Sequence, residues 1–209
     1  MIFNKFDFDD GSTYIGELYD KTESLVPTLI EPKLFRDDRG YFFESFNMKD
    51  FENNIGQKIN FVQDNESFSQ KGTLRGMHFQ KRGYAQSKLV RVIKCAVYDV
   101  AVDIRPWSNT FGKYVGVYLS EDNHQQFFIP RGFAHGFVAL EDNTIFQYKC
   151  DNYYSKENEG SFSWNTIGIP WGNYINLNNI ILSDKDANAK SFDDVFYDTL
   201  LAKSKLIIG

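Results

Sequence analysis

The chain contains three histidines, and two of them interrupt runs that otherwise have the character of β-strands. His78 lies in Leu74-Arg75-Gly76-Met77-His78-Phe79-Gln80, and His135 stands beside a glycine at the start of another apolar run. An imidazole titrates near neutral pH, so both side chains are suited to removing or returning a proton. A hydrogen-bonded core histidine is the alternative for His78, and the glycine beside His135 often marks the close approach of a ligand or another backbone. His124 follows a predicted turn, where we expect it to be solvated and without a role.

The spacing of Arg75 and His78 constrains the strand that carries them. Side chains alternate between the two faces of a strand, so residues three apart point to opposite faces. If both residues serve one pocket, Gly76 between them must mark a bulge or a strong twist.

Other polar residues are scattered through strand-like segments. Each of them, taken singly, is expected to be a surface charge or a satisfied core polar group more often than a functional one. Their number in strand contexts predicts a wet, partly cationic cavity in the mouth of a barrel. The set comprises Arg39, Glu44, Gln63, Asp64, Asn65, Arg75, His78, Lys88, His135 and Tyr148.

The histidine pattern argues against a catalytic metal. A three-histidine site would have to recruit the turn residue His124, and the sequence has neither a His-x-His pair nor a His-Glu-x-x-His helix. No glycine-rich Walker or dinucleotide-binding pattern is present either. We therefore expect no catalytic metal and no nucleotide cofactor bound through such a loop.

The elements that must position these residues are short β runs cut by turn signals. Turns as tight as Glu121-Asp122-Asn123 leave no room for crossover helices, so the sheets must be largely antiparallel. This predicts an all-β fold, a barrel-like sandwich or jelly roll. The clearest predicted strands are Leu89–Ile93, Val97–Ile104, Tyr114–Leu119, Gln126–Ile129, Phe133–Leu140 and Thr144–Cys150.

Two helices are predicted at the margins of the barrel. Asn47 caps a short helix over Met48–Ile55, and Ser191 with Asp194 forms a capping box for Phe192–Lys203. Residues 1–24 fit no periodic template and are predicted to form an N-terminal arm, an edge strand or a partly ordered segment. Residues 25–209 then form one domain with a C-terminal helical segment.

Composition narrows the class of protein further. The 209 residues carry a net charge of −5, so no global basic surface exists for nucleic acid or an anionic membrane. No apolar stretch is long enough for a membrane helix, and the N-terminus does not have the pattern of a secretory signal, which predicts a cytosolic location. In that compartment we expect Cys95 and Cys150 to be buried thiols without a disulfide.

Five segments, in order, together resemble the dTDP-4-dehydrorhamnose 3,5-epimerase family. They are Leu74–Gln80, Lys88-Leu89-Val90-Arg91-Val92, Val97–Arg105, Phe133-Ala134-His135-Gly136-Phe137 and Leu182-Ser183-Asp184-Lys185-Asp186-Ala187, and the resemblance covers about Leu25 to Val195. It implies a cupin-type jelly roll, a homodimer with strand exchange, and epimerisation of carbons 3 and 5 of dTDP-4-dehydro-6-deoxy-D-glucose, through an enolate and without a metal or cofactor.

The same resemblance implies roles for individual residues. His78 is similar to the family's general base, Asp186 to the carboxylate that orients it, and Tyr148 to the acid on the opposite face. Lys88 is similar to the group that steadies the enolate oxygen. The residues that resemble the family's substrate-binding set are Arg39, Glu44, Gln63, Asp64, Asn65, Arg75, His135, Glu159 and Lys185, some of them reaching across the dimer.

Three other functions are weighed against this one. A single-carbon epimerase of a related nucleotide-linked 4-keto sugar shares the same residues. A non-catalytic nucleotide-sugar-binding cupin is predicted to lack the base or the acid, and both are present here. A metal-dependent cupin oxygenase is disfavoured by the missing His-x-His pair.

Overall fold

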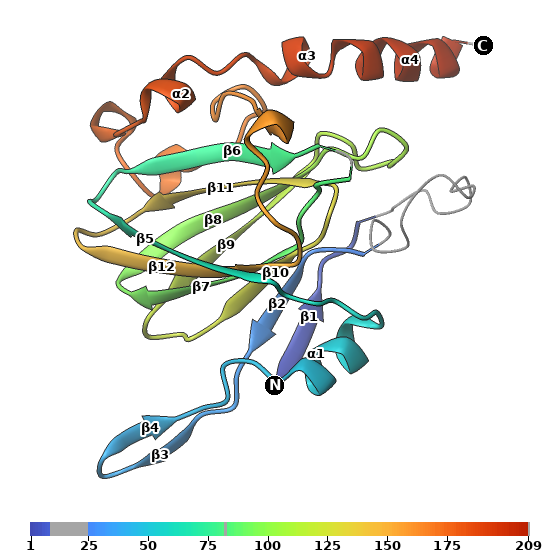
Figure 1. Ribbon diagram of the computed structural model, residues 1–209. Coiled ribbons are helices and arrows are strands. Elements are labelled where there is room, and N and C mark those ends of the chain that lie inside the picture. The colour runs from blue at the N-terminus through green and yellow to red at the C-terminus, as the bar shows by residue number, and fades with distance from the viewer. Residues whose placement is uncertain (9–24, 82, 209) are drawn as a thin grey trace.

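The computed structural model describes residues 1–8, 25–81 and 83–208, and most of its strands form two antiparallel sheets that pack face to face as a barrel (Figure 1). The first sheet has the order β1 (Ile2–Lys5), β2 (Thr28–Glu31), β10 (Gln126–Ile129), β7 (Lys88–Lys94), β12 (Thr144–Cys150) and β5 (Gln63–Ser69). The second has the order β13 (Glu159–Ser161), β6 (Leu74–Gln80), β11 (Phe133–Ala139), β8 (Ala96–Asp103) and β9 (Tyr114–Ser120). The predicted antiparallel all-β barrel is thus confirmed, and each of the six predicted strands matches to within one residue at either end.

Three apolar clusters hold these layers together. The barrel interior is filled from both sheets by side chains such as Val90, Ala101, Phe127, Phe137 and Phe146. A second cluster joins the outer face of the β6–β11–β8 sheet to the C-terminal segment, and a third joins the other sheet to the first helix. Because both faces of β8 are covered, all of its residues are buried.

The helix α1 (Met48–Ile55) begins and ends where the sequence signals predict. Asn47 caps it by accepting a hydrogen bond from the backbone N–H of Asp50, and Gly56 ends it in the left-handed conformation with φ of 90°. Its buried residues Phe51 and Ile55 pack on the sheet that contains β10.

The C-terminal segment corrects one prediction. The single helix expected over Phe192–Lys203 is two helices, α3 (Phe192–Val195) and α4 (Tyr197–Ile208), separated at Phe196. The ring of Phe196 packs against Phe79 of the barrel and Phe111, as well as Phe192. This tertiary packing outweighs the local preference for a continuous helix. None of the helices in the described part of the chain is long and apolar enough to span a membrane.

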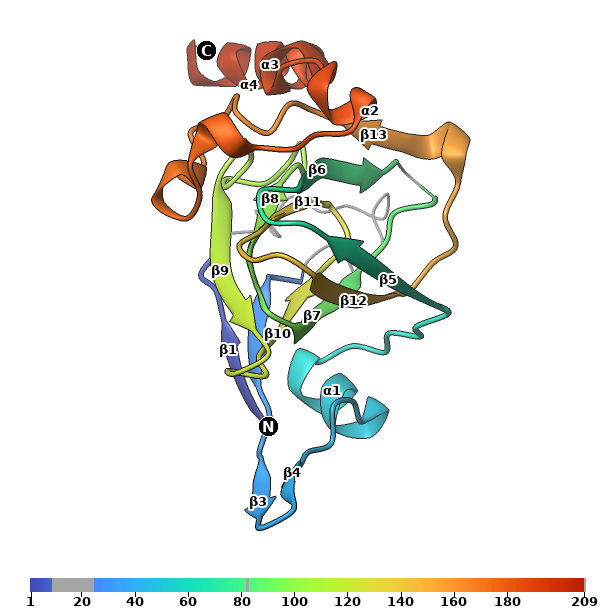
Figure 2. The same cartoon turned by 90° about the vertical axis from the view of Figure 1, so that its left-hand side faces the viewer.

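The other helical elements are short. They are α2 (Asp184–Ala187), which the sequence analysis did not predict, and three 3₁₀ turns, η3 (Lys156–Asn158), η4 (Trp171–Asn173) and η5 (Leu177–Asn179). The α helices of this segment lie over the β6 side of the barrel (Figure 2). The segment thereby closes one side of the molecule and brings α2 into contact with β6.

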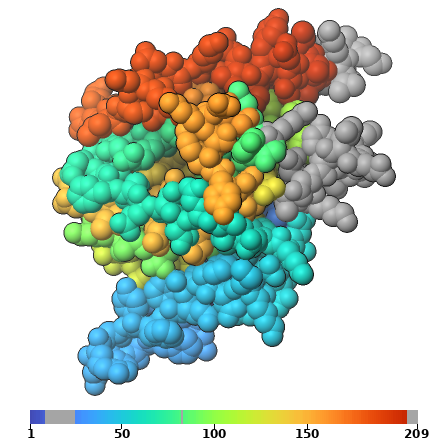
Figure 3. All heavy atoms as spheres, viewed as in Figure 1, coloured from blue at the N-terminus to red at the C-terminus, as the bar shows by residue number. Residues whose placement is uncertain are grey.

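A hairpin of β3 (Phe35–Asp37) and β4 (Gly40–Phe42) projects from the barrel (Figure 3). Two of its aromatic side chains are exposed, Phe35 at 54% and Phe42 at 70%. His124, expected to be solvated, instead lies against the rings of Tyr41 and Phe43, at centroid distances of 4.6 and 5.3 Å.

Two further sequence-based predictions concern the N-terminus and the cysteines. Ile2–Lys5 of the predicted arm forms β1 at the edge of the first sheet, and residues 9–24 lie outside the described part of the chain. Both cysteines are free, Cys150 being buried and Cys95 half-buried.

The bulge predicted at Gly76 is present. On β6 Arg75 and His78 are three positions apart, but their partners on β11, Phe137 and His135, are only two positions apart, so β6 carries the extra residue. Gly76 has φ of 129°, and a Cβ built on it would lie 2.5 Å from the Cα of Gly136. The position therefore requires glycine both for its conformation and for the close approach of two backbones.

We expect Gly76→Ala to lower the free energy of unfolding by about 2–6 kcal/mol, combining backbone strain with a steric clash. Gly40 on the hairpin has the same φ of 129°, but a Cβ added there would have no atom within 4 Å, so Gly40→Ala should cost only the strain, about 1–3 kcal/mol. Urea denaturation of both variants measures the difference. Equal losses would show that the approach to Gly136 imposes no steric limit.

Candidate active site

A cavity of about 480 Å³ is lined by residues of both sheets and of the segment that leads into α2. A second cavity of about 280 Å³ adjoins it, and Asn65, His78, Lys88 and Tyr148 line both. The predicted site residues that line one or both cavities are Gln63, Asn65, Arg75, His78, Lys88, His135, Tyr148, Glu159 and Asp186. Residues far apart in the sequence therefore converge on one site.

His78 and Asp186 form a short hydrogen-bonded pair at the cavity wall. His78 Nε2 lies 2.6 Å from Asp186 Oδ1, and the side chain of His78 is 29% exposed whereas that of Asp186 is only 4% exposed. The capping residue of α2, Ser183, donates its hydroxyl to the other carboxylate oxygen at 2.9 Å. Ser183 thus fixes the carboxylate. Among the described residues, the other imidazole nitrogen, His78 Nδ1, has no hydrogen-bond partner and can face a ligand.

The environment of Asp186 favours its charged form. Burial of the carboxyl acts to raise its pKa, but the hydrogen bonds from His78 and Ser183, together with the nearby Lys185, outweigh this and hold the pKa below its usual value. An ionised Asp186 accepts a hydrogen bond from His78 Nε2–H, which leaves Nδ1 as the basic atom.

Lys88 and Tyr148 lie together on the opposite sheet. The ammonium nitrogen of Lys88 is 5.7 Å from the centre of the Tyr148 ring. Burial lowers the pKa of Lys88, and burial raises the pKa of Tyr148 although Arg75 opposes that shift. The phenol therefore remains protonated at neutral pH and can donate a proton.

His135 is the second buried histidine of the site. It contacts Lys88, with 3.5 Å between Nζ and His135 Nδ1, and its Nε2 lies 2.9 Å from Asp99 Oδ2. Burial lowers the pKa of His135, so the imidazole is neutral at pH 7. Asp99 was missed by sequence reasoning, although a carboxylate inside the apolar run Val97–Val102 was a readable signal.

One end of the site is polar and contains an ion pair. Glu159 forms a salt bridge with Lys185, with 2.5 Å between Oε1 and Nζ. It also accepts a hydrogen bond from the hydroxyl of Tyr154 at 3.2 Å. The side-chain amide of Gln63 donates a hydrogen bond to Asn65 Oδ1 at 2.9 Å, on the face of β5 that the two residues share. Tyr154, which also lines the smaller cavity, was not among the predicted residues.

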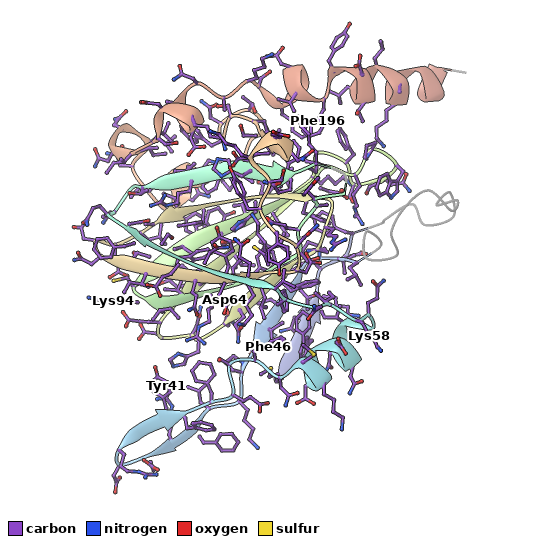
Figure 4. All side chains as sticks on the ribbon, in the orientation of Figure 1. Tyr41, Phe46, Lys58, Asp64, Lys94 and Phe196 are labelled. Carbon is purple, nitrogen blue, oxygen red and sulfur yellow. The ribbon has the colours of Figure 1, made fainter. Side chains whose placement is uncertain are left out.

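Three predicted residues lie away from the cavity within this chain. Asp64 points to the other face of β5, where it pairs with Lys149 at 3.1 Å (Figure 4). Arg39, on the projecting hairpin, is almost fully exposed and pairs with Asp37 at 2.6 Å. Glu44 follows the hairpin and is exposed. Among the described residues, no group of three or more histidine, cysteine, aspartate or glutamate side chains is arranged to hold a metal ion.

Comparison with known proteins gives consistent matches. The profile of the dTDP-4-dehydrorhamnose 3,5-epimerase family matches residues 26–194. A dTDP-4-dehydrorhamnose 3,5-epimerase of Shigella flexneri is 52% identical over 179 residues, which cover 85% of this chain and 97% of that protein.

Solved structures agree with these matches. The crystal structure of a dTDP-4-dehydrorhamnose 3,5-epimerase from Elizabethkingia anophelis is 51% identical with a TM-score of 0.77, covering 80% of this chain and 92% of its own. That of a dTDP-6-deoxy-D-glucose-3,5-epimerase from Legionella pneumophila, in complex with dTDP-4-keto-L-rhamnose, is 46% identical with a TM-score of 0.77, covering 83% and 91%.

Proposed function

The chain belongs to the dTDP-4-dehydrorhamnose 3,5-epimerase family, and we propose that His78, Lys88 and Tyr148 carry out its epimerisation of carbons 3 and 5. The enzyme is an isomerase that acts on a dTDP-linked 4-keto sugar. Both carbons flank the ketone at carbon 4, so their protons are acidified by the carbonyl. Inversion then needs a base on one face, an acid on the other, and stabilisation of the charge between the two steps.

One observation carries the proposal: the candidate base and the candidate acid line the same cavity from opposite sheets. His78 comes from β6 of the second sheet, and Tyr148 comes from β12 of the first. A sugar ring between them presents one face to the imidazole and the other to the phenol. Removal of a proton by His78 and return of a proton by Tyr148 therefore invert the carbon.

His78 acts as the base through the nitrogen that does not contact Asp186. The carboxylate of Asp186 holds one tautomer and stabilises the imidazolium that forms after proton transfer. Lys88 contributes a fixed positive charge in a buried position, where it stabilises the enolate oxygen formed from the ketone.

The nucleotide and diphosphate of the ligand are assigned to the polar end of the site together with the cation of the larger cavity. Arg75 provides a cation at the cavity, where it donates hydrogen bonds to Ser69 and to the carbonyl of Phe68 at 3.3 Å. His135 lines the cavity next to Lys88, where the ketone of the sugar is proposed to bind. The proposed binding set is completed by Gln63, Asn65, Glu159 and Lys185. A chain with a net charge of −5 must supply such cations locally to bind a diphosphate.

We assign Arg39, Glu44 and Asp64 to a site shared between two subunits of a homodimer. The hairpin that carries Arg39 extends away from the barrel of its own chain, and its exposed Phe35 and Phe42 offer apolar surface for a second copy (Figures 1 and 3). The hairpin of one subunit and the segment that follows it then contribute Arg39 and Glu44 to the cavity of the partner.

Mixing two variants that are each expected to be inactive tests whether the hairpin of one subunit completes the site of the other. In a heterodimer of Arg39→Glu and His78→Ala, one site combines an intact His78 with an intact hairpin, and the other site is doubly defective. We expect the purified heterodimer to have about half the activity of the same amount of wild-type dimer, because one of two sites is restored. Sedimentation velocity gives the oligomeric state. A monomer, or no recovery after verified subunit exchange, contradicts the shared site.

Proton exchange in deuterated water tests the proposed function itself. With dTDP-4-keto-6-deoxyglucose, NMR should show deuterium at carbons 3 and 5 and the product with both centres inverted. Inversion of one carbon only would make the enzyme a single-carbon epimerase. Binding of the substrate without any exchange would leave a non-catalytic sugar-nucleotide-binding protein and overturn the proposal.

A further inference from the structure

Three side chains from three strands form a line that ends at the cavity. Asp99 on β8 contacts His135 on β11 at 2.9 Å, and His135 approaches Lys88 on β7 at 3.5 Å. Asp99 faces the barrel interior, on the same face of β8 as Val97 and Ala101. The line therefore runs from inside the barrel to the ammonium group proposed to stabilise the enolate.

The inner end of this line is a buried charge with few partners. Asp99 is 0% exposed and His135 is 6% exposed. In the described part of the chain, Asp99 Oδ1 has no hydrogen-bond partner, so its contact with His135 is made through Oδ2 alone. A buried carboxylate is normally surrounded by donors, because its desolvation is costly. A structural role alone gives no reason for a carboxylate here, since a neutral side chain would avoid that cost.

The hydrogen-bonding roles along the line follow from the chemistry of each group. A carboxylate only accepts, so His135 must donate Nε2–H to Asp99. The neutral imidazole then has a lone pair on Nδ1, which faces Lys88. An ammonium only donates, so the Lys88–His135 contact requires this tautomer and no other.

The charges along the line are also complementary. Lys88 contacts His135 on β11 and the ring of Tyr148 on β12. It shares the smaller cavity with Tyr148, Cys150 on β12, His78 on β6 and Glu159 on β13. Burial lowers the pKa of Lys88, whereas the negative charges of Asp99 and Glu159 act to raise it. Of these two carboxylates, Asp99 is linked to Lys88 through a single buried imidazole, whereas Glu159 is paired with Lys185.

We propose that Asp99 is a positioning residue, which holds His135 in the Nε2–H tautomer and through it keeps the Lys88 ammonium charged and aimed into the cavity. The site thus contains two histidine–carboxylate pairs with different tasks. Asp186 orients the imidazole that removes the proton, and Asp99 orients the imidazole that holds the cation. This inference rests on the proposed role of Lys88.

Asp99→Asn preserves the volume of the side chain and removes its charge. We expect kcat to fall about ten- to a hundredfold, the range for losing a hydrogen bond to a charged group, with KM changed less than about threefold. The alkaline limb of the kcat profile should move to lower pH, because a less stabilised ammonium loses its proton sooner. Ser120→Ala is the control, because it removes another buried polar side chain, at the end of β9. It should change neither kcat nor the alkaline limb of the kcat profile.

Nitrogen NMR of the histidine rings gives a readout that a purely structural role would not move. In the wild type, His135 should show a protonated Nε2 and an unprotonated Nδ1, and Asp99→Asn should change this pattern. Assignment is direct because the chain has only three histidines. Circular dichroism establishes that the variant is folded. If Asp99→Asn does not fold, the protonation of the His135 ring nitrogens in the wild type tests the inference by itself. A protonated His135 Nδ1 in the wild type overturns it.

A double-mutant cycle separates this inference from the function on which it rests. If Lys88→Met retains full activity, the proposed role of Lys88 fails. If Lys88→Met loses activity but Asp99→Asn keeps the wild-type kcat and pH profile, only the inference fails. We expect the double variant to be no slower than Lys88→Met alone, because Asp99 acts through Lys88. Independent, multiplicative losses would assign Asp99 a different role.

Discussion

Replacing His78 by asparagine is expected to slow deuterium exchange at carbons 3 and 5 about 10²- to 10⁴-fold, the usual contribution of a positioned general base. Asparagine preserves a polar side chain next to Asp186 but has no basic nitrogen. Exchange reports proton removal directly, so it separates the base from later steps. Binding of dTDP, measured by calorimetry, should remain within a few-fold of wild type. Undiminished exchange would remove His78 from the mechanism.

The carboxylate behind His78 allows a matched comparison within the same chain. Asp186 and Asp194 occupy the same kind of motif, each accepting a hydrogen bond from a serine that caps a short helix, Ser183 or Ser191. Only Asp186 contacts a histidine. Asp186→Asn should therefore reduce exchange in the same direction as His78→Asn, and Asp194→Asn should leave it unchanged. Equal effects of the two substitutions would mean that activity depends on capping and not on the histidine pair.

Replacing Tyr148 by phenylalanine should separate exchange from inversion. The ring remains, but the proton that returns to the opposite face is lost. We expect formation of the doubly inverted product to fall about 10²- to 10⁴-fold, the usual contribution of a general acid. His78 can still remove and return protons on its own face, so deuterium should enter with retained configuration. The ratio of exchange to inversion, measured by NMR on one sample, should rise.

Tyr118 provides the control for this substitution. It lies on β9 and is 48% exposed, outside both cavities. Tyr118→Phe removes the same hydroxyl from the same residue type and should leave exchange and inversion at wild-type values. Parallel losses of exchange and inversion in Tyr148→Phe would mean that the phenol is needed before proton removal, which contradicts its assignment as the acid of the second step.

The sequence by itself determined the elements that depend on local physical chemistry. Runs of β-branched and aromatic residues bounded by turn residues located strands such as Gln126–Ile129 and Thr144–Cys150 to the residue, because strand propensity and turn propensity are local properties. The capping signal at Asn47 located α1 in the same way. The spacing of Arg75 and His78 predicted a bulge or a strong twist at Gly76 if both residues serve one pocket; both line the larger cavity, and the pairing of β6 with β11 contains the bulge.

The family resemblance extended the sequence-based predictions from secondary structure to function. Matching motifs placed the chain among the dTDP-4-dehydrorhamnose 3,5-epimerases, and the comparisons confirm the family and its activity. The roles of individual residues stay predictions, which the variants above test. The alternation of side chains along β5 also explains why Asp64 lies on the face opposite Gln63 and Asn65, although the three are consecutive.

Only the tertiary structure decided which distant side chains meet. The helix break at Phe196 depends on the ring of Phe79 in the barrel, and the pairing of Asp99 with His135 depends on the register of β8 and β11. The projection of the hairpin that carries Arg39 away from its own barrel is also a feature of the tertiary structure, which the sequence analysis did not predict. Local propensity acts over a few residues, whereas these contacts are set by packing between segments that are tens of residues apart.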